Sequence, residues 1–200
     1  MKAGLWLVCL CASLAACVSA APERLPANTY VEADTGFHLR WPATFVPEAR
    51  SSAAYLLPTN WRLDLRPNEP GRLLAGWVLQ GSNQVLSARL RYGVSGNAKS
   101  FANCLKAGGG GLATNQVMIG GRPFTHYRLQ DAGMSHFLQA DAYRSRYQGR
   151  CYAIDLIING TNPQVYDPPA TPPFSREQAQ AALHQLLLRI GWLTPAEDGR

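Results

Sequence analysis

The sequence predicts an α+β fold in which a mostly antiparallel sheet packs against helices. Segments of alternating apolar and polar residues, the pattern of half-buried strands, recur along the 200-residue chain. Short turns that contain glycine join several of these segments, which is typical of antiparallel hairpins. A run of apolar residues at helical spacing follows near the end of the chain and predicts a terminal amphipathic helix.

The first half of the chain predicts a series of strands. In the earliest one, Phe37, Leu39 and Trp41 alternate with polar residues until Pro42 ends the run. The same kind of alternation predicts strands at 36–42, 61–66, 73–80 and 84–92. Only Gly81-Ser82-Asn83 separates the last two, so we expect them to form a hairpin.

The spacing of apolar residues changes after these strands and predicts a helix at 98–107. Asn97 is placed to cap the start of this helix and Gly108 its end. The helical spacing turns Cys104 toward the core.

A meander of strands is expected next, at 116–119, 123–130 and 135–147. Its turns would be Gly120-Gly121 and residues 131–133. The segment 150–158 is apolar on both faces, and this pattern predicts a central strand of the sheet.

The last part of the chain combines a connector with a helix. The proline-rich segment 162–174 shows no periodicity and is expected to cross the surface in an extended form. The helix then starts with Ser175 and Gln178 at capping-box spacing and is expected to end at Gly191. Its apolar face would consist of Ala179, Ala182, Leu183, Leu186, Leu187 and Ile190.

The first residues resemble a bacterial lipoprotein signal. Lys2 precedes an apolar run that ends in Leu14-Ala15-Ala16-Cys17 and is too short to span a bilayer, which takes about 20 residues. The resemblance implies that Cys17 is acylated and that the chain is anchored in the membrane by its lipid. Ordinary cleavage after Val18-Ser19-Ala20 is the alternative, and both interpretations export the domain. Because Val18 is not the aspartate that retains such proteins at the inner membrane, the resemblance implies the outer membrane.

We therefore expect four parts in the chain. They are a lipoprotein signal peptide at 1–16, a lipidated tether at 17–28, a single periplasmic domain at 29–193 and a flexible tail at 194–200. About 180 residues usually form one domain with one core. The 46% hydrophobic and 16% charged residues are typical of a globular protein.

The net charge is +6 and falls by one when Lys2 leaves with the signal. A positive charge favours binding to nucleic acid, to an anionic membrane or to acidic partners. Export argues against nucleic acid. Because the arginines are dispersed along the chain, a solvated surface is the simpler interpretation.

Cys104 and Cys151 are the cysteines of the expected domain, and an oxidising compartment lets such a pair persist as a disulfide. Closing a loop of about 47 residues would stabilise the fold by roughly 4 kcal/mol. A pair of reactive or metal-binding thiols is the alternative, but no CxxC spacing favours it.

Several features occur in the order found in one known fold. These are Gly-Phe-x-Leu-x-Trp-Pro near the start of the domain, Gly120-Gly121, two long strands ending in Cys-Tyr-Ala-Ile-Asp-Leu, and the terminal helix. Together they resemble the PsbP-like family, which includes extrinsic photosystem subunits and periplasmic lipoproteins of the DcrB type. The resemblance covers about Tyr30 to Trp192 and implies an antiparallel sheet between helices, an α/β/α sandwich. It also implies a binding, assembly or chaperone-like role without chemistry.

Candidate chemistry centres on His126, His136 and Asp141, which would supply metal ligands or an acid–base pair if their strands are neighbours. A small periplasmic hydrolase or metal-dependent enzyme is therefore the alternative function. However, histidine on a strand is more often a hydrogen-bonded or surface residue, and the spacing matches no metal signature. Nor does Gly93-Val94-Ser95-Gly96 complete the nucleophile turn Gly-x-Ser-x-Gly. We expect no enzyme activity, no metal and no cofactor.

Tyrosine and arginine are interleaved around the end of the meander, and both are enriched at protein interfaces. The candidate interaction face consists of Tyr143, Arg144, Arg146, Tyr147, Arg150, Tyr152 and Tyr166. Cross-strand pairing that stabilises the sheet is the alternative interpretation.

The function expected from the sequence is that of an outer-membrane-anchored periplasmic lipoprotein that binds an envelope protein or polymer without catalysis. A second alternative is an inhibitor of a lysozyme-like enzyme. Such targets are often basic, so a basic chain would be repelled from them at long range.

Overall fold

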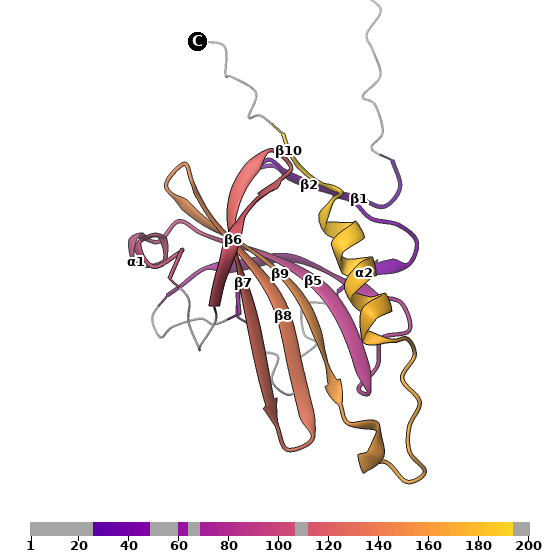
Figure 1. Ribbon diagram of the computed structural model, residues 1–200. Coiled ribbons are helices and arrows are strands. Elements are labelled where there is room, and N and C mark those ends of the chain that lie inside the picture. Colours follow the sequence, from indigo (N-terminus) through magenta and orange to yellow (C-terminus); the bar gives the residue numbers. More distant parts are fainter. Residues whose placement is uncertain (1–25, 49–59, 64–68, 107–111, 194–200) are drawn as a thin grey trace, which may run out of the picture.

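The structure is a computed structural model that describes residues 26–48, 60–63, 69–106 and 112–193. Two antiparallel sheets make up most of it (Figure 1). Its strands are β1 (Thr29–Glu32), β2 (Phe37–Arg40), β3 (Phe45–Pro47), β4 (Arg72–Leu79), β5 (Leu86–Ser95), β6 (Leu112–Ile119), β7 (Arg122–Gly133), β8 (His136–Tyr147), β9 (Arg150–Thr161) and β10 (Ile190–Trp192). Its helices are α1 (Ala98–Ala102), the 3₁₀ helix η1 (Pro163–Val165) and α2 (Arg176–Leu187).

The larger sheet has seven strands in the order β3-β4-β5-β9-β8-β7-β6, and every neighbouring pair is antiparallel. Strand β9 lies at its centre, and all of its residues after Arg150 are buried. The apolar residues on both faces of 150–158 therefore predicted its position correctly. The hairpin of β4 and β5 and the Gly120-Gly121 turn between β6 and β7 are confirmed as well.

The smaller sheet, in the order β1-β2-β10, packs across one end of the larger one (Figure 1). Its central strand inserts Phe37, which is fully buried and stacks on Tyr92 of β5 with ring centroids 3.9 Å apart. Trp192 of β10 packs edge-on against both rings. This aromatic layer joins the two sheets into one hydrophobic core.

Helix α2 covers β5 and β9 on one face of the larger sheet and leaves β7 and β8 uncovered on that face toward the hairpin that joins them (Figure 1). Nearer the smaller sheet, Ile119, Phe124 and Tyr143 of β6, β7 and β8 are buried in the core. The predicted capping box is present, because Ser175 accepts from the amide of Gln178 and the Gln178 side chain accepts from the amide of Ser175. Ala179, Leu183 and Leu186 are buried against the sheet. None of the helices in the described ranges is long and apolar enough to cross a membrane.

The expected mostly antiparallel sheet is confirmed. The fold is mostly β, with 51% of the described residues in strands and 14% in helices, so the expected α/β/α sandwich fits only loosely. Helix α1 ends at Ala102 instead of residue 107, because the amide of Cys104 donates to the carbonyl of Phe101 in a turn. A disulfide then ties Cys104 to the start of β9. Among the described residues, the short helix α1 is therefore the helix on this side of the sheet, and the predicted Gly108 cap lies outside them.

Three other predictions are corrected. Residues 60–63 form a bend and a turn rather than a strand, and the rest of 61–66 lies outside the described residues. Strand β7 runs on to Gly133, so the turn before β8 consists of Met134 and Ser135, both with positive φ. Finally, α2 ends at Leu187 rather than at Gly191. Ile190 does not belong to the helix but begins β10, which pairs with β2.

Candidate functional site

A cluster of charged and polar side chains lies where α2 borders the uncovered part of the sheet. Asp141 on β8 is at its centre, because each of its carboxylate oxygens faces a histidine. His126 Nε2 on β7 lies 2.7 Å from Asp141 Oδ1, and His184 Nε2 on α2 lies 3.4 Å from Oδ2. The cluster therefore draws on three elements that are far apart in the sequence.

His126 uses both of its ring nitrogens. Its Nδ1 lies 3.3 Å from Oδ1 of Asn115 on β6, while its Nε2 faces Asp141. The ring stacks on Tyr143, with centroids 4.8 Å apart. A ring held at both nitrogens and on one face has a fixed orientation, so His126 and Tyr143 hold the Asp141 carboxylate in place.

Tyr143 forms the floor of the cluster and is buried. Burial raises the pKa of its phenol well above the ordinary value, and the nearby charge of Asp141 raises it further. The phenol is therefore neutral at neutral pH and acts as an apolar platform for the imidazole.

A pocket of about 190 Å³ opens beside Asp141, between β7, β8 and α2. Five of its seven lining residues are polar, and a narrower adjoining recess, lined in part by apolar residues, reaches His184 and Leu183 of α2. The larger pocket is lined by Arg128, Leu129, Gln130, Gln139, Ala140, Asp141 and Gln180. We call this pocket with its adjoining recess the polar cleft.

The polar cleft is suited to hydrogen bonding. Arg128 supplies donors, Asp141 supplies acceptors, and the amide side chains of Gln130, Gln139 and Gln180 supply both. Such a set matches a ligand rich in hydroxyl or amide groups. In the described part of the chain, no group of three or more His, Cys, Asp or Glu side chains is arranged to hold a metal ion.

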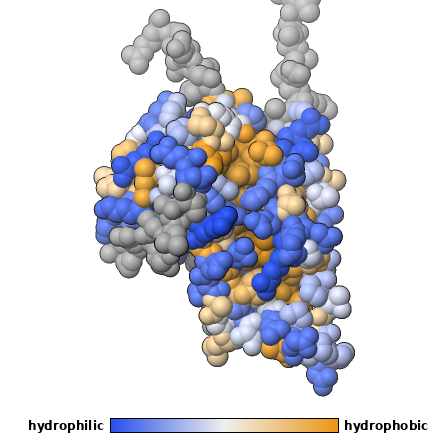
Figure 2. Space-filling model, viewed as in Figure 1, coloured by the Kyte–Doolittle hydropathy of each residue, from blue (hydrophilic) through white to orange (hydrophobic). Residues whose placement is uncertain are grey.

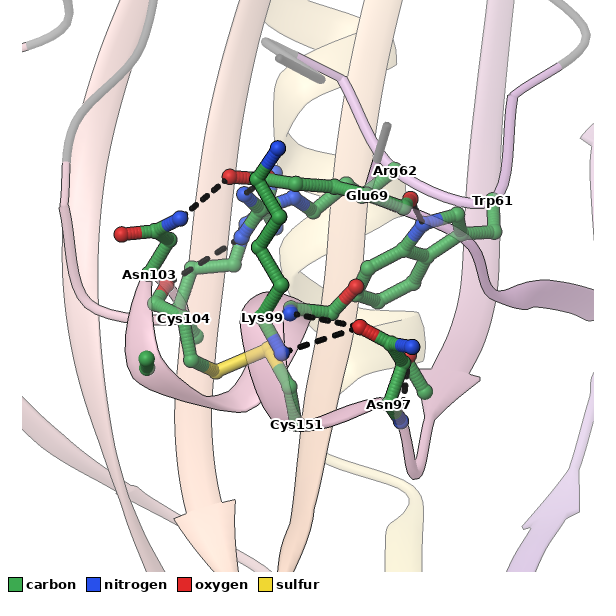
Figure 3. Close-up of polar contacts among 12 residues, drawn as sticks. Trp61, Arg62, Glu69, Asn97, Lys99, Asn103, Cys104 and Cys151 are labelled. Carbon is green, nitrogen blue, oxygen red and sulfur yellow. Dashed lines mark hydrogen bonds and ion pairs between the residues drawn. A yellow bond between two sulfur atoms is a disulfide. The ribbon is translucent and has the colours of Figure 1, made fainter. Parts of the chain in front are cut away.

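The opposite face of the sheet carries a second polar cluster, which surrounds the disulfide (Figure 3). Arg62 and Glu69 form an ion pair at 2.5 Å, with side chains 1% and 0% exposed. Arg62 Nη1 also donates to the carbonyl of Cys104, and Asn103 Nδ2 donates to Glu69. These bonds attach residues 60–63 to the turn after α1, and the depth of burial gives the cluster a structural role.

A further buried pair lies on this face. Arg144 Nη1 on β8 donates to Asp155 Oδ1 on β9 at 2.7 Å, and both side chains are 2% exposed. Asp155 Oδ2 accepts from the backbone amide of Leu63 at 2.9 Å. Asp155 thus binds the bend at residues 60–63 to the centre of the sheet.

The structure brings two of the three histidine and aspartate candidates together. His126 and Asp141 meet, but His136 lies at the far end of β8 and is 3.0 Å from the hydroxyl of Thr161. The reason is the register, in which His126 pairs with Tyr143 and His136 pairs with Gly133 at the opposite end of the strands. His184, which the sequence did not single out, takes the place expected for His136.

The residues of the candidate interaction face do not share one face. Successive side chains of a strand point to opposite faces, so Arg144 is buried beneath residues 60–63 while Tyr143 faces α2. Arg146 stacks on Phe101 of α1. Tyr166 follows η1 at the other end of the sheet. The remaining three, Tyr147, Arg150 and Tyr152, lie together at the end that carries the smaller sheet.

Sequence reasoning missed the contribution of α2 to the cleft. Gln180 and His184 are four residues apart and half-buried, at the border of the apolar face of the helix. Polar residues at the border of an apolar helix face are the sequence signal that could have identified these two residues as part of a cleft. Cys17, the predicted lipidation site, lies outside the described residues.

No known protein family matches this chain, and no curated protein matches it. Among solved structures, a match is found to LpqN, described as involved in cell envelope biogenesis of Mycobacterium tuberculosis. The TM-score is 0.44 at 10% sequence identity, and the match covers 83% of this chain and 90% of LpqN.

Proposed function

We propose that this chain is a lipid-anchored periplasmic binding module of the cell envelope, and that its polar cleft binds a saccharide unit of an envelope polymer. The acyl group on Cys17 holds it at the outer membrane. The domain carries out no chemistry. The observation that carries the proposal is the position of Asp141, fixed by two histidines at the edge of a pocket of hydrogen-bonding side chains.

The geometry around His126 favours binding over catalysis. A general base needs a free ring nitrogen within reach of the substrate proton. Both nitrogens of His126 instead face oxygen atoms of Asn115 and Asp141. The cluster therefore orients a carboxylate that accepts hydrogen bonds from a ligand.

The size of the cleft favours one unit of a larger partner. Its volume of about 190 Å³ is below the roughly 300–1,000 Å³ of most small-molecule sites. The uncovered strands β7 and β8 continue the surface beyond it, so a polymer has room to extend. Hydroxyl and acetamido groups are the chemistry that carboxylate, amide and guanidinium side chains recognise by hydrogen bonds.

Two features support export and anchoring. The Leu14-Ala15-Ala16-Cys17 sequence resembles a lipoprotein signal. The bond between Cys104 and Cys151 is of a kind that persists in an oxidising compartment.

The cleft is tested by titrating the ¹⁵N-labelled protein with two defined probes, a disaccharide–peptide fragment of peptidoglycan and a core oligosaccharide of lipopolysaccharide. We expect one of them to shift the amide signals of β7, β8 and α2 around the cleft. Asp141→Asn should weaken that binding at least about tenfold, because a hydrogen bond to a charged group contributes about 1.5–3 kcal/mol. Gln180→Ala should weaken it about fivefold, since an ordinary hydrogen bond contributes about 1 kcal/mol.

Gln185→Ala is the matched control, because Gln185 is exposed on the same helix and does not line the cleft. If Gln180→Ala and Gln185→Ala weaken probe binding equally, the cleft is not the binding site. If neither probe binds and a photo-crosslinker at Gln180 captures an envelope protein instead, the saccharide assignment is wrong.

The anchor and the absence of catalysis have separate tests. Fatty-acid labelling should disappear in Cys17→Ser, and label that persists there would contradict acylation at Cys17. The competing hydrolase would need His126 and Asp141 as an acid–base pair. Probe hydrolysis that is lost in His126→Gln and kept in His136→Gln would establish the enzyme and refute the binding module.

A further inference from the structure

Both ends of the described chain lie at one end of the molecule. Residue 26 leads into β1 and residue 193 follows β10, and both strands belong to the smaller sheet (Figure 1). The tips of the β6–β7 and β8–β9 hairpins lie beside this sheet. Trp192 Nε1 donates to the carbonyl of Ile119, and Arg150 Nη1 donates to that of Asp34. We call residues 26–41, 118–123, 146–151 and 188–193 the terminal end.

If Cys17 carries the lipid, as the proposed function holds, the terminal end is the part nearest the bilayer. Eight residues lie between Cys17 and residue 26, so nine Cα–Cα steps join the two positions. Fully extended, these nine steps span at most about 32 Å. The 12-residue strands of the larger sheet measure roughly 40 Å. The tether is thus shorter than the sheet is long, so the opposite end cannot be the one held against the membrane.

The charges of the described residues are distributed unevenly along this axis. The terminal end holds more basic than acidic side chains: Arg40, Arg122, Arg146, Arg150 and Arg189 against Glu32 and Asp34. The opposite end consists of residues 79–86, 130–137 and 160–177. There the balance is reversed, with Asp131, Asp167 and Glu177 against Arg176. An anionic surface would attract the terminal end and repel the other.

Apolar side chains are exposed among these arginines. Leu188 is 76% exposed, Met118 65% and Leu193 48%. In Figure 2, hydrophobic residues reach the surface near the top of the view, bordered by hydrophilic ones. Apolar side chains flanked by arginine are typical of surfaces that rest in the interfacial region of a bilayer.

Arg122 is the best-placed residue for a headgroup. Its guanidinium carbon lies 4.1 Å from the centroid of the Tyr147 ring and 4.0 Å from that of Trp192. The two rings hold the guanidinium in place at the hairpin tip. Its Nη1 is buried and has no hydrogen-bond partner among the described residues, so the remaining guanidinium nitrogens, Nε and Nη2, are the donors for a ligand. A phosphate oxygen is an acceptor that suits them, and arginine binds phosphate with two donors at once.

We propose that the terminal end is a membrane-contact surface that binds anionic phospholipid headgroups, with Arg122 as a principal phosphate ligand. This inference rests on the lipid anchor of the proposed function. It adds that the domain stands on the bilayer in a defined orientation, with the polar cleft directed away from the anchored end.

The test uses the acylated full-length protein reconstituted into vesicles of phosphatidylcholine, with or without 30% phosphatidylglycerol. Backbone hydrogen exchange is followed by mass spectrometry in peptides that cover 118–123 and 146–151. We expect exchange at both hairpin tips to be slower on the anionic vesicles, and the difference to disappear in high salt. Arg122→Gln should lower the docking equilibrium constant about fivefold, the effect of one basic residue at an anionic surface.

Arg176→Gln is the matched control. Arg176 also stacks on an aromatic ring, that of Phe137 at 3.9 Å, but at the opposite end of the sheet. The Arg176→Gln variant should leave the protection of the hairpin tips against hydrogen exchange unchanged. Loss of protection in both variants would show that net charge alone acts, and this result would overturn the assignment of Arg122.

The failures of the two proposals are distinguishable. Protein that floats with both kinds of vesicle but shows equal exchange at the tips keeps its anchor and refutes the contact surface. Protein that floats with neither kind of vesicle has no anchor, and the same exchange comparison with free protein and anionic vesicles then decides the contact surface alone. Protection that arises only when envelope proteins are added would assign the terminal end to a protein partner and refute the lipid.

Discussion

Replacing Cys104 and Cys151 together by alanine is expected to lower the free energy of unfolding by about 4 kcal/mol. The two residues are 47 positions apart in the sequence, and both are 0% exposed. The disulfide restricts the unfolded chain to conformations in which these positions meet, and the entropy of closing a loop of this length gives that figure. Loss of packing around two buried sulfur atoms adds to it.

The measurement is urea unfolding followed by tryptophan fluorescence and circular dichroism. For a domain of this size, the loss corresponds to a fall in Tm of about 8–16 °C. The slope of the free energy against urea should become steeper, because an unfolded chain without the cross-link exposes more surface.

Wild-type protein treated with dithiothreitol is the control, because reduction breaks the same bond without removing the sulfur atoms. The difference between reduced wild type and the double alanine variant measures the packing contribution alone. A double variant within about 1 kcal/mol of the oxidised protein, with an unchanged slope, would refute the argument from the unfolded chain.

Three further outcomes are expected. Asp155→Leu leaves Arg144 buried without its carboxylate and should cost about 3–5 kcal/mol in urea unfolding, whereas Arg144→Met combined with Asp155→Leu should recover most of the loss. Burial raises the pKa of the Tyr143 phenol in the folded state above its value in the unfolded chain. The stability that the neutral phenol contributes is therefore complete below pH about 10 and falls as the pH rises further, because the unfolded chain then loses this proton first. Tyr143→Phe should flatten the decline in unfolding free energy between pH 10 and 11.5, and parallel curves would contradict this prediction. Ser175→Ala removes the cap of α2 and should cost about 1 kcal/mol by the same urea measurement; no change would exclude a stabilising capping box.

Much of the fold could be predicted because it depends on local patterns. The alternation in β2, the Gly120-Gly121 turn and the Ser175 cap involve residues a few positions apart, whose preferences are set by side-chain periodicity and backbone conformation. Local patterns failed at residues 60–63, where the alternation of Trp61 and Leu63 predicted a strand. The amide of Leu63 instead binds the carboxylate of Asp155, 92 positions away.

The candidate site was predictable in part for the same reason. The sequence predicted that the strands of His126 and Asp141 are neighbours. The turn at Met134 and Ser135, rather than the predicted 131–133, sets the register that brings the two side chains together. The partner from the helix could not be predicted. The register of β7 and β8 places His136 away from Asp141. The approach of His184 depends on how α2 crosses β5 and β9, and helical periodicity gives only the face of a helix and not its docking position.

By itself, the sequence determined the strand order of the hairpins, the capping of α2 and the pairing of Cys104 with Cys151. It determined the pairing because the expected domain holds only these two cysteines. Tertiary structure decided that Ile190–Trp192 forms a strand of the smaller sheet, that Arg144 is buried in an ion pair, and that Arg122 is held between Tyr147 and Trp192. These features depend on register and packing between segments that are distant in the sequence, and the contacts that stabilise them form only when the chain folds.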